Sequence, residues 1–187
     1  MMSDQIYNRD TVVLVDVNDR ELGLADKLIA HQQGLLHRAF SVMLYRYHNN
    51  QLEFLLQKRA LSKYHCAGLW TNTCCSHPGM GEDIKISSLN RLQEELLDID
   101  LDKINLKNIG SFIYHAEFTN GLIEHEYDHV FIAEHHNTPN WFNKSEIAEL
   151  AWFSVDYIKN NYNLNKDSYT PWFKQVIDLV GVALLMI

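Results

Sequence analysis

Two pairs of apolar segments, each pair separated by a short turn, constrain the fold of this chain more than any other feature. The segments LLHRAFSVMLYRY and LEFLLQKR flank the turn sequence HNNQ. The segments IGSFIYHAEF and HEYDHVFIAEH lie on either side of TNG. Apolar runs around a short turn are typical of β-hairpins. The sequence therefore predicts two β-hairpins and a strand-rich fold.

Further strands and two helices are predicted around these hairpins. Three segments have the character of short strands: TVVLVDVND, GLWTNTCCSH and ELAWFSV. In IKISSLNRLQEELLDI, residues 84–99, apolar residues recur close to the helical period. The segment SYTPWFKQVIDLVGVALL begins with a Thr-Pro cap and continues as a helix. This order predicts the α/β class, of the α+β type, with helices packed on a curved or split sheet.

The chain is expected to form a single domain over residues 1–187, with an N-terminal strand extension and a C-terminal helix. It has no repeat and no low-complexity segment, and only 3 prolines and 8 glycines interrupt it. Hydrophobic residues make up 47% of the sequence, which is enough to bury a sizeable core.

The net charge restricts the classes of partner. Lys and Arg total 16 and Asp and Glu total 24, so the formal net charge is −8. This balance disfavours non-specific binding to nucleic acid or to an anionic membrane. A small anionic ligand held by a few basic side chains remains compatible with it.

The termini and the cysteines indicate a cytoplasmic protein. The segment MMSDQIYNRD lacks the apolar core of a signal peptide. The most apolar run, VIDLVGVALLMI, is about half the roughly 20 residues that a spanning helix needs, and Asp178 interrupts it. We therefore expect a packed terminal helix. Three cysteines, two of them adjacent, do not form a disulfide framework, and reduced thiols fit best.

Residue spacing identifies two pairs of side chains that could do chemistry. Residues i and i+2 of a strand share a face. Cys75 and His77 in NTCCSHPGMGE form one such pair, and Glu124 and Glu126 in IEHEYDHVF form the other. His125, between the two glutamates, is expected to point to the opposite face. The two pairs could therefore meet across one pocket.

Histidine and carboxylate together suit a divalent metal such as Zn²⁺ or Mn²⁺. His31 and His37, at the entry to the first hairpin, would add two imidazoles.

Each of these features also has an interpretation without a functional role. In a chain with 10 histidines such spacings arise by chance, and an E-x-E pair is usually a solvated face. Adjacent cysteines can be small hydrophobes, and the basic run QKRALSK can be a solvated loop. Spacing alone thus predicts a candidate metal site and no specific reaction.

Four motifs together resemble a known family. LLHRAFSV, NTCCSHP, EHEYDHVF and TPWFK, at these separations, resemble the type 1 isopentenyl-diphosphate isomerases. The resemblance extends from about Asp16 to Lys174. It implies a Nudix-like α/β fold. It also implies interconversion of isopentenyl and dimethylallyl diphosphate through a carbocation, in isoprenoid biosynthesis.

The resemblance also implies roles for individual residues. Cys75 would be a catalytic acid/base, Glu126 the second proton-transfer residue, and Tyr114 the tyrosine beside that glutamate. The implied ligands of a divalent metal, Mn²⁺, Zn²⁺ or Mg²⁺, are His31, His37, His77, Glu124 and Glu126.

The remaining implied roles concern the substrate, a small-molecule diphosphate. Glu95 would help hold a second cation, Mg²⁺, on the diphosphate, and Trp172 would cover the hydrocarbon end. The residues implied to contact the diphosphate are Lys27, Arg59, Lys63 and Ser76. We expect a monomer or a weak dimer.

The central helix departs from the Nudix signature G-x5-E-x7-R-E-U-x-E-E-x-G-U. Asn90 takes the place of its Arg, Arg91 that of its first Glu, and Leu97 that of its Gly, so only Glu94 and Glu95 of this core remain. The hydrolases need that carboxylate cluster for Mg²⁺. A Nudix-type diphosphate hydrolase is therefore the second hypothesis, and a metal-binding structural or adaptor module is the third.

Overall fold

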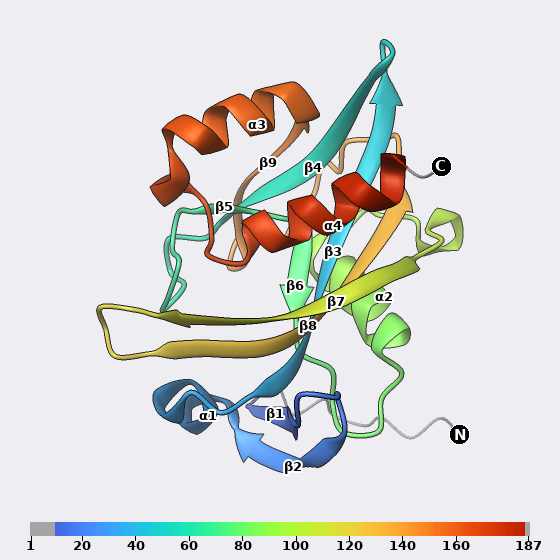
Figure 1. Cartoon of the computed structure of the whole chain (residues 1–187). Helices are drawn as coiled ribbons and strands as arrows, with labels where there is room; N and C mark the ends of the chain where they lie inside the picture. The colour runs from blue at the N-terminus through green and yellow to red at the C-terminus, as the bar shows by residue number, and fades with distance from the viewer. Residues whose placement is uncertain (1–9, 186–187) are drawn as a thin grey trace.

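The computed structural model describes residues 10–185. Within this range nine strands join one mixed sheet, with helices on both of its faces (Figure 1). The strands are β1 Thr11–Val15, β2 Glu21–Asp26, β3 His37–His48, β4 Gln51–Arg59, β5 Trp70–Thr71, β6 Cys74–Ser76, β7 Lys107–Glu117, β8 Ile123–Glu134 and β9 Ile147–Ser154. The helices are α1 Lys27–Gln33, α2 Ile84–Glu95, α3 Val155–Leu164 and α4 Phe173–Leu185, with short 3₁₀ helices at Leu101–Lys103 and Lys166–Ser168.

Both predicted hairpins are confirmed. β3 and β4 pair antiparallel around Asn49 and Asn50, whose φ angles of 48° and 60° are left-handed. Two successive left-handed residues form the tight turn that matches the twist of a two-residue hairpin, and asparagine tolerates this conformation. β7 and β8 pair antiparallel around a longer turn in which Gly121 has a φ of 82°.

The long strand β3 connects the two hairpins. One edge of β3 pairs in parallel with β8 over nine positions, from His37 to Tyr45. The other edge is shared by β1 at His37, by β6 at residues 40–42 and by β4 at residues 44–48. Because the neighbours of β3 change along its length, the sheet splits on that side. The predicted α+β class and split sheet are confirmed.

The predicted helices are present, but their ends differ from the prediction. α2 begins after Asp83, whose side chain accepts a hydrogen bond from the N–H of Ile86, and it ends at Glu95 instead of near Ile99. It stops there because the backbone of Leu96, whose side chain is buried, forms an isolated β-bridge with Phe142. α4 begins at Phe173 because Pro171 and Trp172 form a turn before it.

Several elements were not predicted, namely β2, α1, α3 and the two 3₁₀ helices. α1 has only seven residues, too few for a clear helical period, and it is bounded by the Asp26 cap and a left-handed Gly34. The predicted strand in GLWTNTCCSH is divided into β5 and β6. Asn72 and Thr73 separate them, and the side-chain amide of Asn72 donates to the carbonyl of Cys74 at 2.6 Å.

A separate apolar core lies on each face of the sheet. On one face α2 packs over Phe40, Val42 and Cys74. On the other face, at the front of Figure 1, α4 packs over Met43 and its neighbours, and Cys75 borders that second core. The adjacent cysteines therefore point to opposite faces, as the strand period requires. The prediction that Cys74 points away from Cys75 is confirmed.

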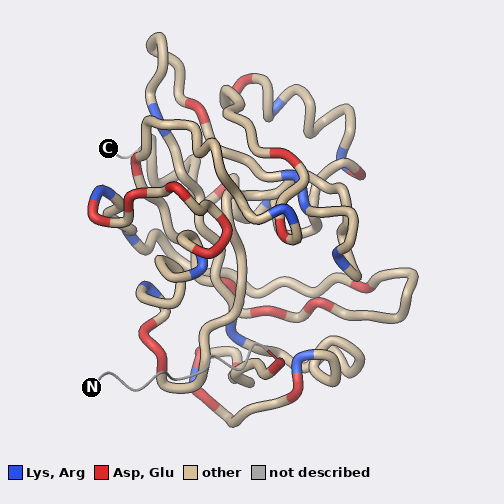
Figure 2. Tube along the Cα trace, turned by 180° about the vertical axis from the view of Figure 1, so that it is seen from behind, with Lys and Arg blue, Asp and Glu red and all other residues tan. Residues whose placement is uncertain are grey.

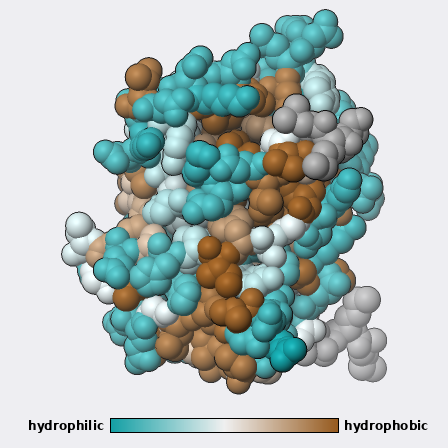
Figure 3. Space-filling view, viewed as in Figure 1, coloured by the Kyte–Doolittle hydropathy of each residue, from teal (hydrophilic) through white to brown (hydrophobic). Residues whose placement is uncertain are grey.

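The surface is mixed in charge and polarity. In the view from behind, basic residues are interspersed with acidic ones along the trace (Figure 2). Apolar side chains reach the surface around β2 and α1, where Leu22, Leu24 and Leu28 are exposed (Figure 3).

None of the helices in residues 10–185 combines the length and the apolar character needed to span a membrane. α4 is instead packed as predicted, with Val176 and Val180 fully buried.

Leu92 and Leu97 test the packing of α2 through its contribution to stability. Leu92 lies in the last turn of the helix, and Leu97 follows its end. Leu92 is fully buried in the first core, whereas Leu97 is 54% exposed. Leu92→Ala should lower the free energy of unfolding by about 3 kcal/mol, because it leaves a cavity that the sheet cannot close. Leu97→Ala should change it by about 0.5 kcal/mol. Urea unfolding followed by circular dichroism measures both, and equal losses would contradict the packing of α2 described above.

Candidate active site

The site is a cavity of about 250 Å³ between the start of α1, the β4–β5 loop, β6, α2 and the β7–β8 hairpin. It brings together residues from the whole length of the chain. The predicted residues that line it are Lys27, Arg59, Lys63, Cys75, Ser76, His77, Glu95, Tyr114, Glu124, Glu126 and Trp172. The other two, His31 and His37, are 1% and 0% exposed and lie next to Glu124 and Glu126.

Three histidine rings form a cluster at this cavity. The ring centroids of His31 and His37 are 4.9 Å apart, and those of His37 and His77 are 5.0 Å apart. The Nδ1 atoms of His31 and His37 lie 2.6 and 2.8 Å from the carbonyl oxygens of Lys27 and Leu35. A carbonyl can only accept, so each Nδ1 carries the proton and each Nε2 presents a lone pair.

These lone pairs are buried without a hydrogen-bond partner. Nε2 of His31 and Nε2 of His37 both lack one among the described residues. An unsatisfied buried polar atom is costly, and here two of them converge on one point. Neutral imidazoles held by carbonyls through Nδ1 are the usual arrangement of metal-binding histidines.

The two glutamates complete this cluster from the same face of β8. Glu126 Oε1 lies 2.8 Å from His77 Nε2 and 3.6 Å from His37 Nε2. Glu124 Oε2 lies 3.4 Å from His31 Nε2. One ligand atom each from His31, His37, His77 and Glu126 lies within 4.8 Å of the others, so this group could hold a divalent metal ion. His125 points to the other face, where its Nδ1 lies 2.9 Å from the carbonyl oxygen of Gly34.

The electrostatics of the cluster also suit a cation. Burial and the neighbouring Glu126 raise the pKa of Glu124. Burial also acts to raise the pKa of Glu126, but the neighbouring imidazoles of His37 and His77 hold it well below its usual value. Burial and the positive charge of Lys27 lower the pKa of His77 to about 3, so this ring is neutral. Two close carboxylates beside three imidazoles form a donor set that a divalent cation would stabilise.

A thiol and a carboxylate stand on strands separated by β3. Cys75 pairs with Ser41 on one edge of β3, and Glu126 pairs with His37 on the other edge. The two strands are therefore roughly 10 Å apart, twice the usual strand spacing. Burial raises the pKa of Cys75 to about 12, although Arg59 opposes the shift, so the thiol keeps its proton. The hydroxyl of Tyr114 donates to Glu126 Oε2 at 2.6 Å.

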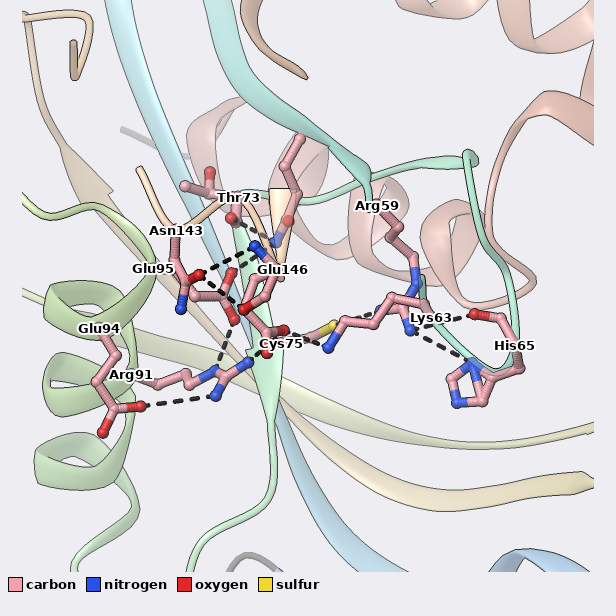
Figure 4. Close-up of polar contacts among 12 residues, drawn as sticks. Arg59, Lys63, His65, Thr73, Cys75, Arg91, Glu94, Glu95, Asn143 and Glu146 are labelled. Carbon is pink, nitrogen blue, oxygen red and sulfur yellow. Dashed lines mark hydrogen bonds and ion pairs between the residues drawn. The ribbon is translucent and has the colours of Figure 1, made fainter. Parts of the chain in front are cut away.

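Basic residues at the opposite end of the cavity are held by carboxylates (Figure 4). Lys63 forms an ion pair with Glu146. Arg91 donates from Nε to Glu95 Oε1 at 2.6 Å and lies 2.7 Å from Glu146 through Nη2. The second oxygen of Glu95 accepts from Gln57 at 2.9 Å. The positively charged side chains of Lys63 and Arg91 at this end of the cavity could therefore bind a phosphate group in place of a protein carboxylate.

Trp172 borders both the cavity and the second core. Its indole N–H donates to Asn72 Oδ1 at 3.1 Å, and the side chain is 2% exposed. The guanidinium carbon of Arg59 is 5.6 Å from its ring centroid, and the ring of Tyr114 is 5.8 Å away. The ring is thus fixed beside Arg59 and Tyr114.

Sequence reasoning assigned no site role to three residues that line the cavity, Arg91, Glu146 and His65. Arg91 lies one helical turn before Glu95, a spacing that could have identified it. Glu146 and His65 lie in loops whose docking depends on contacts distant in sequence, and no local pattern indicates them.

Comparison with known proteins agrees with this architecture. The NUDIX domain model matches residues 35–173. Isopentenyl-diphosphate Delta-isomerase of Photobacterium profundum is 46% identical over 171 residues, which cover 91% of this chain and 94% of the relative. Isopentenyl-diphosphate Delta-isomerase 2 of Photorhabdus laumondii is 44% identical over 169 residues, 90% of this chain and 91% of the relative.

The chain belongs to the isopentenyl-diphosphate Delta-isomerase family, within the NUDIX domain proteins. Among solved structures, DR0079 from Deinococcus radiodurans superposes with a TM-score of 0.71 at 16% identity, covering 90% of this chain and 97% of that one. At this identity the likeness supports the Nudix fold alone. The predicted family and fold are thereby confirmed.

Two histidines on opposite faces of the sheet, the buried His31 and the half-buried His125, test the metal cluster. His31→Ala removes an unsatisfied Nε2 and should weaken Mn²⁺ binding by at least about 10-fold. His125→Ala changes a ring on the other face of β8 and should leave the affinity within about twofold. Isothermal titration with Mn²⁺ after chelator treatment measures both, with circular dichroism to establish that each variant is folded. Wild-type affinity in His31→Ala would exclude the proposed metal cluster.

Proposed function

We propose that this chain interconverts isopentenyl diphosphate and dimethylallyl diphosphate, with Cys75 and Glu126 moving the protons. The observation that supports this most directly is the placement of a thiol and a carboxylate on strands either side of β3, at one buried cavity. All nine strands of the described residues join one sheet, which supports a single catalytic domain. We also propose a monomer or a weak dimer.

The chemistry requires two groups because the double bond is not activated. One group adds a proton to the terminal alkene carbon, which leaves a tertiary carbocation at C3. The other removes a proton from C2, and the electron pair of that C–H bond forms the new double bond. The count of protons is unchanged, so the reaction is an isomerisation. Each group acts as acid in one direction and as base in the other.

The residues around this pair would stabilise the cation and exclude water. The indole face of Trp172 and the ring of Tyr114 offer negative π surface to a developing positive charge. Both side chains are at most 6% exposed. A dry site matters because water would capture the carbocation.

The polar end of the cavity would bind the diphosphate. Lys27, Arg59 and Lys63 supply positive charge there, and Ser76 supplies a hydroxyl. Glu95 would hold Mg²⁺ on the diphosphate, where the ion neutralises phosphate charge. His31, His37, His77, Glu124 and Glu126 would hold a Mn²⁺, Zn²⁺ or Mg²⁺ ion, whose charge favours the carboxylate form of Glu126.

The alternative, a Nudix-type diphosphate hydrolase, is disfavoured by Arg91. This residue stands where the hydrolase signature has a glutamate, and it pairs with Glu94, Glu95 and Glu146. A cation among these carboxylates reduces the negative charge that a cluster of Mg²⁺ ions would need.

One assay separates the isomerase from the hydrolase. Purified protein is incubated with isopentenyl diphosphate and Mg²⁺, and the products are resolved by chromatography and a phosphate assay. Formation of dimethylallyl diphosphate without phosphate release is the expected result. Release of inorganic phosphate would support the hydrolase, and no turnover would favour a binding module.

The two adjacent cysteines test the proton-transfer assignment. Cys75→Ala should lower kcat by about 10²–10⁴-fold, because it removes a proton-transfer group and leaves the diphosphate contacts in place. Cys74→Ala alters only the first core and should keep most of the turnover. Steady-state kinetics with isopentenyl diphosphate measures both, and near-normal turnover in Cys75→Ala would remove this residue from the mechanism.

A further inference from the structure

His65 lies in the loop between β4 and β5 and links two groups with different proposed roles. Its Nε2 is 2.6 Å from Glu124 Oε1, and its Nδ1 is 3.3 Å from Nη2 of Arg59. Glu124 is a proposed metal ligand, and Arg59 is a proposed diphosphate-binding residue. Figure 4 shows the guanidinium of Arg59 directed at the ring and at the carbonyl oxygen of His65.

The chemistry of Arg59 fixes the direction of both hydrogen bonds. A guanidinium can only donate, so Nδ1 of His65 accepts and the ring proton is on Nε2. That N–H then donates to Glu124 Oε1. The neutral ring is therefore oriented as a bridge from Arg59 to Glu124.

This bridge determines how Glu124 faces the histidine cluster. Oε1 is engaged by His65, whereas Oε2 has no hydrogen-bond partner among the described residues and lies 3.4 Å from His31 Nε2. The carboxylate cannot rotate without breaking a buried hydrogen bond to His65. One oxygen is consequently held towards the position of the metal.

The ring of His65 is itself held rigidly by the turn between β7 and β8. It stacks on Phe118 with a centroid separation of 5.5 Å and an interplanar angle of 10°. The side-chain amide of Asn120 in the same turn donates to the carbonyl of Tyr64 at 3.0 Å. The hairpin that carries Glu124 thus also fixes the loop that carries His65.

His65 could alternatively bind the metal directly, since its ring lies near ligand atoms of His31 and Glu124. Coordination through Nε2 would move the ring proton to Nδ1. Two N–H donors, of Nδ1 and of Arg59, would then face each other. The observed contact with Arg59 is incompatible with that tautomer, so the geometry favours a positioning role.

We propose that His65 is a positioning residue that holds Glu124 in the orientation required for metal binding, with Arg59 selecting the tautomer that does so. This inference rests on the proposed metal cluster and extends it to a loop that no motif marks. Residues that orient a ligand typically contribute 10–100-fold to metal affinity.

The test compares His65→Phe with His65→Gln. His65→Phe keeps the stacking on Phe118 but removes both nitrogens, and it should weaken Mn²⁺ binding by about 10-fold. His65→Gln keeps one N–H donor and one acceptor and should restore most of the affinity. His115→Phe, at an exposed position of β7, is the matched control and should bind as the wild type does. Wild-type affinity in folded His65→Phe would overturn the proposal.

Two further measurements establish the route of the effect. In a Glu124→Gln background, His65→Phe should cause little additional loss, because the residue acts through Glu124. Pulsed EPR of bound Mn²⁺ should detect the same number of coordinated nitrogens in His65→Phe as in the wild type. Loss of one nitrogen would make His65 a ligand and overturn the positioning role. Failure of the isomerase itself would be seen separately, as absence of dimethylallyl diphosphate with the wild-type protein.

Discussion

The parallel pairing of β3 with β8 is the constraint on which the rest of the site depends. Its register places His37 opposite Glu126, and the β7–β8 register places Tyr114 opposite the same glutamate. On the other edge of β3, Ser41 pairs with Cys75. Because side chains alternate along a strand, a slip of one residue would turn Glu126 away from the cavity. One register therefore positions both the candidate metal cluster and the proposed proton-transfer pair.

The cavity contains an unusual amount of buried charge, and this has an energetic cost. Glu95 and Glu124 are each 2% exposed, and Glu126 and Arg59 are each 8% exposed. Removing such groups from water is unfavourable unless each is paired. Arg91 and Gln57 satisfy Glu95, whereas the unsatisfied atoms of His31 and His37 belong to the group that could hold a metal ion. Three of the unsatisfied buried atoms, Nε2 of His31, Nε2 of His37 and Oε2 of Glu124, thus lie where a cation would complete them.

The position of Arg91 illustrates how one fold can serve two chemistries. The NUDIX helix, here α2, presents Glu94 and Glu95 but has an arginine in place of the preceding glutamate. That arginine converts a carboxylate cluster into a set of ion pairs beside the cavity. The residues proposed to transfer protons lie on strands instead, Cys75 on β6 and Glu126 on β8. The proposed chemistry is therefore carried by the sheet and not by the signature helix.

Local periodicity in the sequence was sufficient to predict the strands of both hairpins, the two longest helices and the opposite directions of Cys74 and Cys75. It also paired Glu124 with Glu126 and directed His125 away, because strand alternation is a property of a few neighbouring residues. Assigning roles to these residues required the family resemblance, since on spacing alone a solvated face was the more usual interpretation of the two glutamates.

Only the tertiary structure decided which residues from distant segments share the cavity. The seven-residue α1, which carries His31, was too short to predict, and the loops that carry His65 and Glu146 have no local signature. Their positions depend on docking against the β7–β8 turn and α2, through contacts such as His65 with Phe118 and Glu146 with Arg91. Hydrogen-bond direction in the Arg59–His65–Glu124 bridge likewise follows from atoms that meet only after the sheet has formed. The sequence by itself determined the strands and the faces of the site, and long-range packing determined which side chains converge there.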